Sequence, residues 1–498
     1  MKKVVSAPFL VLCVALFLSS CGGSSASSSS SGSGGGSNPP PSTSNQWTWV
    51  GGPNTIGVNH GNGGVYGTLG VASTANIPGS RNGATSWTDS SGNLWLIGGY
   101  GYSAEGSFPG SAGIGYLNDL WEYSPSAKTW TWVAGADNTS GNMGSPGIYG
   151  TQGVASSSNM PGGRLGAVSW TDLQGNFWLF GGSGFDSTGK QGVLNDLWSF
   201  NPSTKQWTWV SGSNVCTSAT GATGQPGVYG TLGVASAANV PGGRGNSVTW
   251  TTSDGTLWLF GGSGFDSTDH AGALNDLWSF SPSTGMWTWV SGSNTLGALY
   301  SMGQVGVYGT QGQASTSNMP GGRWASKGWV DSSGHLWLFG GSGYYYTSSA
   351  VTFNDLWMFD PVAKTWTWVT GADTPSATGV YGTMGVAAAA NTPGARDGGV
   401  SWTDSQHNFW LFGGNSFNDL WKFSPSAGTW TWVGGSSAMV GVASYGTLGV
   451  ASALNIPGGR GQGIGWVGSN GSFWLFGGSG YDSTGSQGSL NDLWNYQP

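Results

Sequence analysis

The sequence predicts an all-β fold in which six small sheets, each built from four strands, close into a ring. Three observations support this prediction. One unit recurs six times, each copy contains four strand-like segments bounded by turn residues, and the two ends of the chain each lack the piece that the other end supplies. A sheet of four short strands cannot bury both of its faces alone, so each copy needs its neighbours.

The third copy, residues 241–290, shows the pattern most clearly. Its expected strands are rich in Trp, Phe, Leu, Val and Thr and are bounded by Gly, Pro, Ser or Asp; they cover residues 245–251, 256–260, 274–280 and 286–290. The second strand ends at Gly261 and Gly262, where we expect a close backbone approach that a side chain would block.

Ring closure follows from the order of the motifs. Trp-Thr-Trp-Val occurs six times, beginning at Trp47, Trp130, Trp207, Trp287, Trp366 and Trp430. The first occurrence precedes the first full unit, whereas the last unit stops at Pro498 without one. We therefore expect Gln46–Val50 to form the missing outer strand of the sixth sheet, which also removes the unpaired ends of a linear stack.

The six arginines of the chain all end a Pro-Gly-x-Arg motif: Arg81, Arg164, Arg244, Arg323, Arg396 and Arg460. We expect each to be a structural anchor that pairs with the Asp of an Asn-Asp-Leu-Trp motif: Asp119, Asp196, Asp276, Asp355, Asp419 and Asp492. The alternative is a ring of six cations that lines a channel for anions.

These motifs together resemble kelch repeats, which form the blades of kelch β-propellers and of the central domain of galactose oxidase. An Arg motif, a hydrophobic strand ending in Gly-Gly, an aromatic strand and a Trp-led strand follow one another in all six copies, over residues 46–498. The resemblance implies a six-bladed kelch-type β-propeller. It implies little about chemistry, because one fold carries many functions.

The N-terminus is predicted to be a lipoprotein signal peptide, residues 1–20. Lys2 and Lys3 precede an apolar run, residues 7–18, that is too short to span a membrane. The sequence Leu18-Ser19-Ser20-Cys21 resembles a bacterial lipobox, which implies lipid attachment at Cys21 and a location in the cell envelope. The residue after the cysteine is Gly22, and by resemblance to the sorting pattern of such lipoproteins this favours the outer membrane. An ordinary secretory signal is the alternative. Residues 21–45, mostly Ser and Gly, are predicted to be a flexible tether.

Composition excludes several classes of partner and site. Charged residues make up only 7% of the chain, and without Lys2 and Lys3 the 12 basic residues face 21 acidic ones, a formal net charge of −9. No basic patch occurs, so we expect no nucleic-acid partner. With three Cys in the chain, two of them at positions 13 and 21, Cys216 has no disulfide partner. We expect a monomer.

The long connections are predicted to gather on one face, where binding sites usually lie. The joins between blades each contain Tyr-Gly-Thr-x-Gly, and this repetition indicates a structural role. The candidate ligand residues lie in the variable loops between second and third strands: Glu105 in blade one, and Tyr344, Tyr345 and Tyr346 in blade four, beside the very short loop of blade five. Such aromatic faces suit sugars or peptides, although the three tyrosines could equally pack their own loop.

No catalytic set or metal site is predicted, and no cofactor. The four histidines are scattered: His335 and His407 precede second strands as turn residues, and His60 and His270 lie in separate loops. Asp186, Asp266 and Asp482 recur in Gly-(Phe/Tyr)-Asp-Ser-Thr, where Asx turns are expected rather than calcium.

The functional expectation is therefore a non-catalytic binding or scaffold module for a carbohydrate or a protein. The alternative is a carbohydrate-active enzyme that is similar to galactose oxidase or to sialic-acid epimerases, although no functional residue of either family could be placed in this sequence.

Overall fold

The chain divides into Met1–Ser42 and a compact unit, Thr43–Pro498. The computed structural model describes residues 44–498, apart from 58, 105–112, 140–142, 218–220, 222, 297–301 and 347–348. The predicted signal peptide, Cys21, almost all of the tether and Glu105 lie outside the described residues. Within the described part of the chain, no helix is long and apolar enough to cross a membrane.

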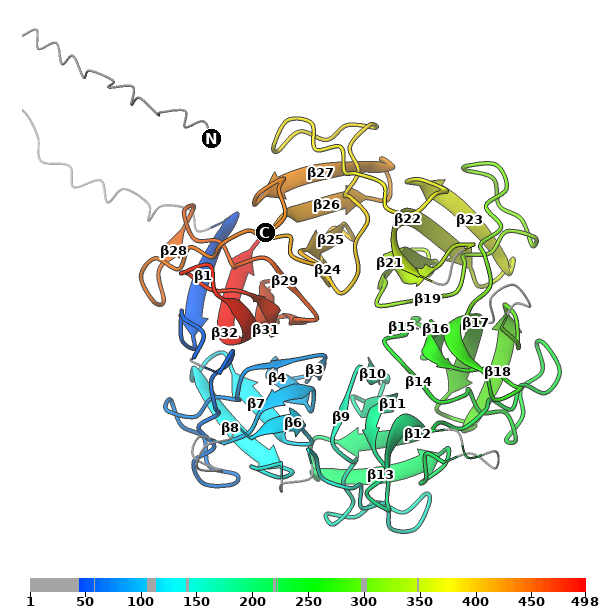
Figure 1. Ribbon diagram of the computed structural model, residues 1–498, viewed down its shortest axis with the longest axis horizontal. Coiled ribbons are helices and arrows are strands. Elements are labelled where there is room, and N and C mark those ends of the chain that lie inside the picture. Colours follow the sequence, from blue (N-terminus) through cyan, green and yellow to red (C-terminus); the bar gives the residue numbers. More distant parts are fainter. Residues whose placement is uncertain are drawn as a thin grey trace, which may run out of the picture. The chain divides into compact units, whose positions relative to one another are not determined.

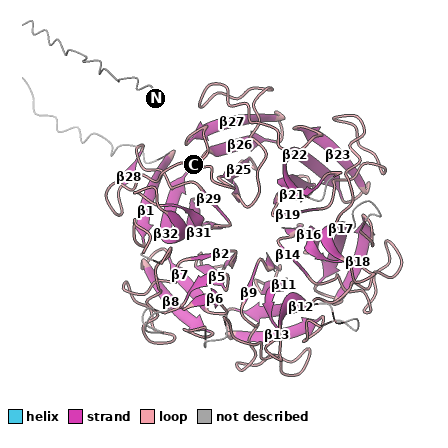
Figure 2. Ribbon diagram, in the orientation of Figure 1, coloured by secondary structure: helices cyan, strands magenta, loops and turns pink. Residues whose placement is uncertain are grey.

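The compact unit is an all-β propeller of six blades, as predicted (Figure 1). Figure 2 shows the compact unit as strands and loops. The strands of blades one to three are β2 (Arg81–Asn82), β3 (Thr85–Thr88), β4 (Leu94–Ile97), β5 (Tyr100–Tyr102), β6 (Ile114–Tyr116), β7 (Leu120–Ser124) and β8 (Thr129–Ala134); β9 (Arg164–Leu165), β10 (Val168–Thr171), β11 (Phe177–Phe185), β12 (Gln191–Asn201) and β13 (Gln206–Ser211); β14 (Arg244–Gly245), β15 (Val248–Thr251), β16 (Leu257–Phe265), β17 (Ala271–Ser281) and β18 (Met286–Ser291).

Blades four to six complete the ring. Their strands are β19 (Arg323–Trp324), β20 (Lys327–Val330), β21 (Leu336–Tyr344), β22 (Ala350–Asp360) and β23 (Thr365–Thr370); β24 (Val400–Thr403), β25 (Phe409–Phe412), β26 (Leu420–Ser424) and β27 (Thr429–Gly434); β29 (Arg460–Gly461), β30 (Ile464–Val467), β31 (Phe473–Tyr481) and β32 (Gln487–Gln497), with β1 (Gln46–Gly51) and β28 (Ala451–Ser452). Each blade is antiparallel, with its first strand at the centre of the ring and its fourth strand outermost.

The N-terminal strand closes the ring as the sequence predicts. Strand β1 pairs with β32 in antiparallel register, so that Trp47 lies opposite Tyr496 and Trp49 opposite Trp494. Trp47 is buried and packs against the rings of Trp402, Phe412, Trp494 and Tyr496. The sixth blade is therefore built from both ends of the chain.

Indole groups on the innermost strands join each blade to the next. Trp250 Nε1, in blade three, donates to the carbonyl oxygen of Trp337 in blade four, 3.0 Å away. An indole bond to the next blade occurs at every other junction as well. The acceptor is on the second strand for Trp170 to Trp258, Trp402 to Trp474 and Trp466 back to Trp95, and on the first strand for Trp87 to Trp170 and Trp329 to Trp402. Because the last bond returns to blade one, the cycle is complete.

Two details of the blade differ from the expected strand bounds. The innermost segment, predicted as one strand over residues 245–251, is divided into β14 and β15 because Asn246 between them has a φ of 55°. The second strand does not end at Gly261 and Gly262. It continues through them as a bulge to Phe265, so that the expected connection over residues 263–273 is mostly a hairpin with a tight turn. Gly261 is required there, since its φ is 62° and a Cβ would lie 2.8 Å from the Arg323 carbonyl oxygen of the next blade.

The long joins between blades were predicted to gather on one face, and this prediction is wrong. Each join runs along the outer strand of the blade that it enters: in blade one, Gly70 N donates to Trp132 O (2.8 Å) and Ser73 N to Trp130 O (3.1 Å). The other blades repeat this arrangement, and in blade six the join covers β1. The outer edge of every blade is therefore covered by its own join, and only part of each join remains on the face where β2, β9, β14, β19 and β29 begin, which we call the loop face.

Candidate functional site

Each arginine of the repeat is part of a buried hydrogen-bonded group of four side chains. In blade three, Arg244 Nη1 and Nη2 donate to the two carboxylate oxygens of Asp276, at 2.7 and 2.8 Å. Asp276 Oδ2 also accepts from the Tyr229 hydroxyl (2.6 Å) and from Trp278 Nε1 (2.7 Å). Arg244 Nε and Nη1 donate in addition to the carbonyl oxygens of Gly242 and Gly261. The guanidinium therefore makes four hydrogen bonds, and the Tyr229 hydroxyl and the Trp278 indole make one each.

All six blades contain this group, with an Arg-Asp ion pair of 2.6–2.7 Å between side chains that are at most 2% exposed. The pairs are Arg81 with Asp119, Arg164 with Asp196, Arg244 with Asp276, Arg323 with Asp355, Arg396 with Asp419, and Arg460 with Asp492. The tyrosines of the joins complete them: Tyr66, Tyr149, Tyr229, Tyr308, Tyr381 and Tyr445.

The charges within these groups keep the arginines protonated and paired with their aspartates. Burial alone lowers the pKa of the Arg244 guanidinium, but the Asp276 carboxylate outweighs it and raises the pKa above its usual value. Burial, and then the same carboxylate, raise the pKa of the Tyr229 hydroxyl well above 10.0. A ring of six arginines that lines a channel for anions is therefore wrong, because none of the six guanidinium groups faces the channel.

A ring of backbone hydrogen bonds surrounds the loop-face end of the channel. It is formed by the residues two positions after each arginine, which we call the collar: Gly83, Gly166, Asn246, Ala325, Gly398 and Gln462. Each collar N–H donates to the collar carbonyl of the preceding blade, and Gly83 N donates to Gln462 O (3.0 Å), which closes the circle at lengths of 2.6–3.0 Å. All six residues have φ between 55° and 65°, including the three that are not glycine.

The channel inside the collar is lined mainly by small and neutral residues. A cavity of about 120 Å³ lies at the collar, bounded by collar residues with Ala84, Ala167, Ser247, Ser326 and Lys327. A second cavity of about 250 Å³ continues along the innermost strands and shares Lys327 with the first. Both are large enough for several water molecules or a small polar ligand.

Lys327 is the one charged side chain that lines either cavity. It lies on β20, four residues after Arg323, where the other blades have Thr85, Val168, Val248, Val400 and Ile464. Burial lowers the pKa of its ammonium group to about 8, although Asp397 of blade five raises it in part. The described residues offer it no ion pair within 4.0 Å and no hydrogen bond.

Blades four and five depart from the repeat beside Lys327. The residue directly after the arginine, which is Asn, Leu or Gly in the other four blades, is Trp324 in blade four and Asp397 in blade five. The ring of Trp324 packs on Tyr344 at a centroid distance of 5.5 Å. The Asp397 carboxylate accepts a hydrogen bond from Ser342 of β21, so it joins the two blades. The short loop of blade five lies against this aspartate, because Asn415 N donates to Asp397 O (3.0 Å).

The predicted tyrosine run lies partly at this place. Tyr344 is the last residue of β21 and contacts Trp324. Tyr345 and Tyr346 contact each other edge to face at 4.9 Å, and Tyr346 is 59% exposed. The three tyrosines therefore do not form one flat surface: the first packs within its blade, and the last is directed to solvent.

The aspartates of Gly-(Phe/Tyr)-Asp-Ser-Thr form Asx turns, and they also hold the joins. Asp186 Oδ1 accepts from Thr188 N (2.7 Å) and Lys190 N (3.0 Å), and its Oδ2 accepts from Cys216 N (3.0 Å). Although burial raises its pKa, these hydrogen bonds outweigh burial and lower the pKa of Asp186 overall. The amides of Leu296 and Ile56 bind Asp266 and Asp482 in the same way.

Cys216 thus occupies the place that an aliphatic side chain takes in two other blades. Its side chain is 1% exposed and is a free thiol. Burial and the neighbouring Asp186 carboxylate raise its pKa to about 11.

The histidines do not come together. His335 and His407 lie in turns between first and second strands, as predicted. Their positions in these turns were expected to be similar but are not equivalent. His335 Nδ1 donates to Asp331 Oδ2 (2.8 Å) at a position where three other blades have Asn, whereas His407, with a φ of 60°, takes the place of a turn glycine. His60 contacts blade six and His270 lies in blade three, which is opposite in the ring. Over the described ranges, no three His, Cys, Asp or Glu residues form a group that could hold a metal ion.

The comparisons with protein-family models and with curated proteins found no match. Among solved structures, the chain is similar to that of YjhT, with 15% sequence identity and a TM-score of 0.45, over 84% of this chain and 95% of that one. A likeness of this degree carries no conclusion about function. The site described above therefore depends on the geometry of this chain alone.

Proposed function

We propose that the protein is a lipid-anchored kelch-type propeller of the bacterial envelope that binds a carbohydrate, without transforming it, at the loop-face end of its channel. One observation carries the proposal. Three residues that depart from the repeat, Trp324, Lys327 and Asp397, lie together where blades four and five meet the collar.

The chemistry of this sector suits a sugar. Trp324 and Tyr344 supply aromatic faces, on which the C–H groups of a sugar ring pack. Asp397, which precedes the collar residue Gly398, and Asn415, which contacts Asp397, supply hydrogen-bonding groups beside the very short loop of blade five. A few polar groups that fix orientation, next to apolar contact surface, are typical of small-molecule sites.

Binding is tested with the purified protein on a glycan array, followed by calorimetric titration of the sugars that bind. We expect Trp324→Ala to weaken binding by about five- to thirtyfold, since burying one aromatic face against a ligand contributes on the order of 1–2 kcal/mol. Leu165→Ala is the matched control, because Leu165 holds the equivalent position in blade two.

Two results would contradict the proposal. One is that no glycan binds, and the other is that Trp324→Ala and Leu165→Ala bind equally well. Conversion of a bound sugar to a new product, detected by NMR, would instead favour the alternative of a carbohydrate-active enzyme.

The envelope location is supported by the sequence Leu18-Ser19-Ser20-Cys21 and by the Ser- and Gly-rich residues that follow it. A lipid at Cys21 would attach the propeller to a membrane through this tether, and we favour the outer membrane. We expect Cys21→Ser to abolish incorporation of labelled palmitate in bacterial cells and to move the protein from the membrane fraction to the soluble fraction. Labelled lipid that persists in Cys21→Ser would rule out this anchor.

A further inference from the structure

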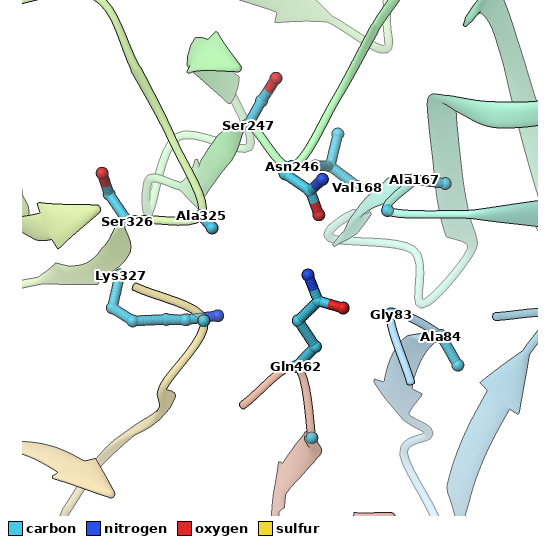
Figure 3. Close-up of a pocket in the computed structure, with 13 residues that line it drawn as sticks. Gly83, Ala84, Ala167, Val168, Asn246, Ser247, Ala325, Ser326, Lys327 and Gln462 are labelled. Atoms are coloured by element: carbon cyan, nitrogen blue, oxygen red, sulfur yellow. The ribbon is translucent and has the colours of Figure 1, made fainter. Parts of the chain in front are cut away.

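Three polar side chains extend into the channel at the collar without a partner among the described residues. Figure 3 shows that Asn246 and Gln462 approach each other from opposite sides of the channel, and that the side chain of Lys327 extends into the same space. Asn246 comes from blade three, Lys327 from blade four and Gln462 from blade six. In the other blades the collar residue is Ala325 or glycine, so the collar position itself adds no polar side chain there.

The three groups share one chemical property, which is that each can donate hydrogen bonds. An ammonium has three donors and no acceptor, and each amide has two N–H donors. The hydroxyl groups nearby are already committed, since Ser247 and Ser326 donate to the carbonyl oxygens of Gly261 (2.8 Å) and Gly340 (2.7 Å). The backbone N–H groups of the collar are used in the collar itself. The free donors of this space are therefore those of Lys327, Asn246 and Gln462.

The charges around the space compensate the ammonium of Lys327 only in part, because the effect of the Asp397 carboxylate is smaller than that of burial. All six arginines are paired with aspartates outside the channel. The nearest carboxylate, Asp397, accepts from Ser342 and makes no ion pair with Lys327 within 4.0 Å. An ammonium that is partly removed from water without a direct ion-pair partner favours binding of an anion.

We propose that the collar end of the channel is a receptor for a small oxyanion, a carboxylate or a phosphate, held by Lys327 Nζ and by the side-chain amides of Asn246 and Gln462. The inference deepens the proposed function, on which it rests for the location of the ligand: the preferred ligand carries an anionic group that enters the channel while its remainder contacts Trp324. A carboxylate or phosphate accepts several charge-assisted hydrogen bonds at once, which matches converging donors.

The test uses the purified protein and two kinds of probe. Acetate and inorganic phosphate, titrated separately and followed by ¹H–¹⁵N NMR, report the anion site without a sugar and distinguish the two oxyanions. Glucose and glucuronate, titrated by calorimetry, differ by one carboxylate. We expect acetate or phosphate to shift the amide signals of the collar, and glucuronate to bind at least tenfold more tightly than glucose.

The variants separate charge from fold. Lys327→Gln is expected to remove the anion response and the preference for glucuronate, whereas Lys327→Arg retains both. Lys364→Gln, which removes an exposed lysine of the same blade, is the control and should change neither.

The outcomes distinguish this inference from the proposed function. Glucose and glucuronate bound equally, with no effect of Lys327→Gln, would overturn the anion site and leave the carbohydrate site intact. An acetate response that depends on Lys327, in a protein that binds no glycan, would support the anion site and contradict the carbohydrate site. The absence of any response of the collar to acetate and phosphate would overturn the inference directly.

Discussion

Replacing Arg244 with lysine tests whether the buried group of four side chains holds its blade together. Lysine keeps the positive charge but replaces the planar guanidinium, with its fixed donors, by a single nitrogen. In the native blade that guanidinium makes four hydrogen bonds of 2.7–3.1 Å, two to Asp276 and one each to Gly242 O and Gly261 O. Its side chain is fully buried, so water cannot replace the bonds that are lost.

The expected loss of stability follows from these bonds. A lysine ammonium at this place can keep a bond to Asp276 and reach at most one of the two carbonyl groups. At least one buried carbonyl oxygen and one lobe of the carboxylate then lose a donor, at about 1–3 kcal/mol each. We therefore expect Arg244→Lys to lower the free energy of unfolding by about 2–6 kcal/mol. Asp276→Asn should cost about 3–5 kcal/mol, because it leaves a buried cation without its counter-charge.

The measurement is urea denaturation followed by tryptophan fluorescence, with midpoints compared at equal m-values. The chain has 31 Trp, so the signal reports every blade. Lys205→Gln, at an exposed turn of blade two, is the control and should stay within about 0.5 kcal/mol of the native protein. An Arg244→Lys protein as stable as this control would refute a structural role for the arginines.

Three further predictions follow from other parts of the ring. Trp47→Ala should destabilise the protein by about 3–5 kcal/mol, since it removes a buried indole at the junction of the two chain ends, and faster proteolysis of Gln46–Gly51 should accompany the loss; an unchanged midpoint would contradict closure by this strand. Cys216, whose thiol is buried with a pKa of about 11, should react with a thiol reagent at pH 8 only after unfolding, as mass spectrometry of the labelled peptide would show. Lys327→Met should stabilise the protein by about 1–3 kcal/mol at pH 7, because burial lowers the pKa of Lys327 from 10.5 to about 8 and the unfolded chain binds the proton more tightly. The stability of the native protein should rise as pH increases from about 8 to about 10.5, so the greater stability of Lys327→Met should vanish near pH 10.5. If the urea midpoints of the two proteins differ by the same amount at pH 7 and pH 10.5, the lowered pKa of Lys327 is refuted.

The parts of the fold that recur six times could be predicted from the sequence. An arginine and an aspartate that each appear once per blade, in a chain with few charges, are natural partners, and the order of the Trp-Thr-Trp-Val motifs indicates how the ends meet. The structure places Arg244 on Asp276 and Trp47 on the final strand accordingly. A residue that recurs in every blade thus indicates a structural role, because each blade packs in the same way against its two neighbours.

The candidate site could not be predicted in the same way. Lys327 occurs once, and its importance comes from the five uncharged residues at equivalent positions, which only a blade-by-blade alignment reveals. The collar depends on positive φ angles at Asn246, Ala325 and Gln462, for which the sequence has no glycine to serve as a signal. The hydroxyl of Tyr229 reaches Asp276 from a long join whose path has no periodicity from which a register could be deduced. Glu105 lies outside the described residues, so its predicted role stays a prediction.

The joins that run along the outer strands have a consequence for how the protein behaves at high concentration. With a charged fraction of 7%, electrostatic repulsion between molecules is weak. An outer strand with free backbone groups would then be a template on which a second molecule could add a strand and begin an intermolecular sheet. Because Gly70 and Ser73 already occupy the carbonyl groups of Trp132 and Trp130, and their counterparts do the same in the other blades, the perimeter is protected against templated aggregation without any charged side chain.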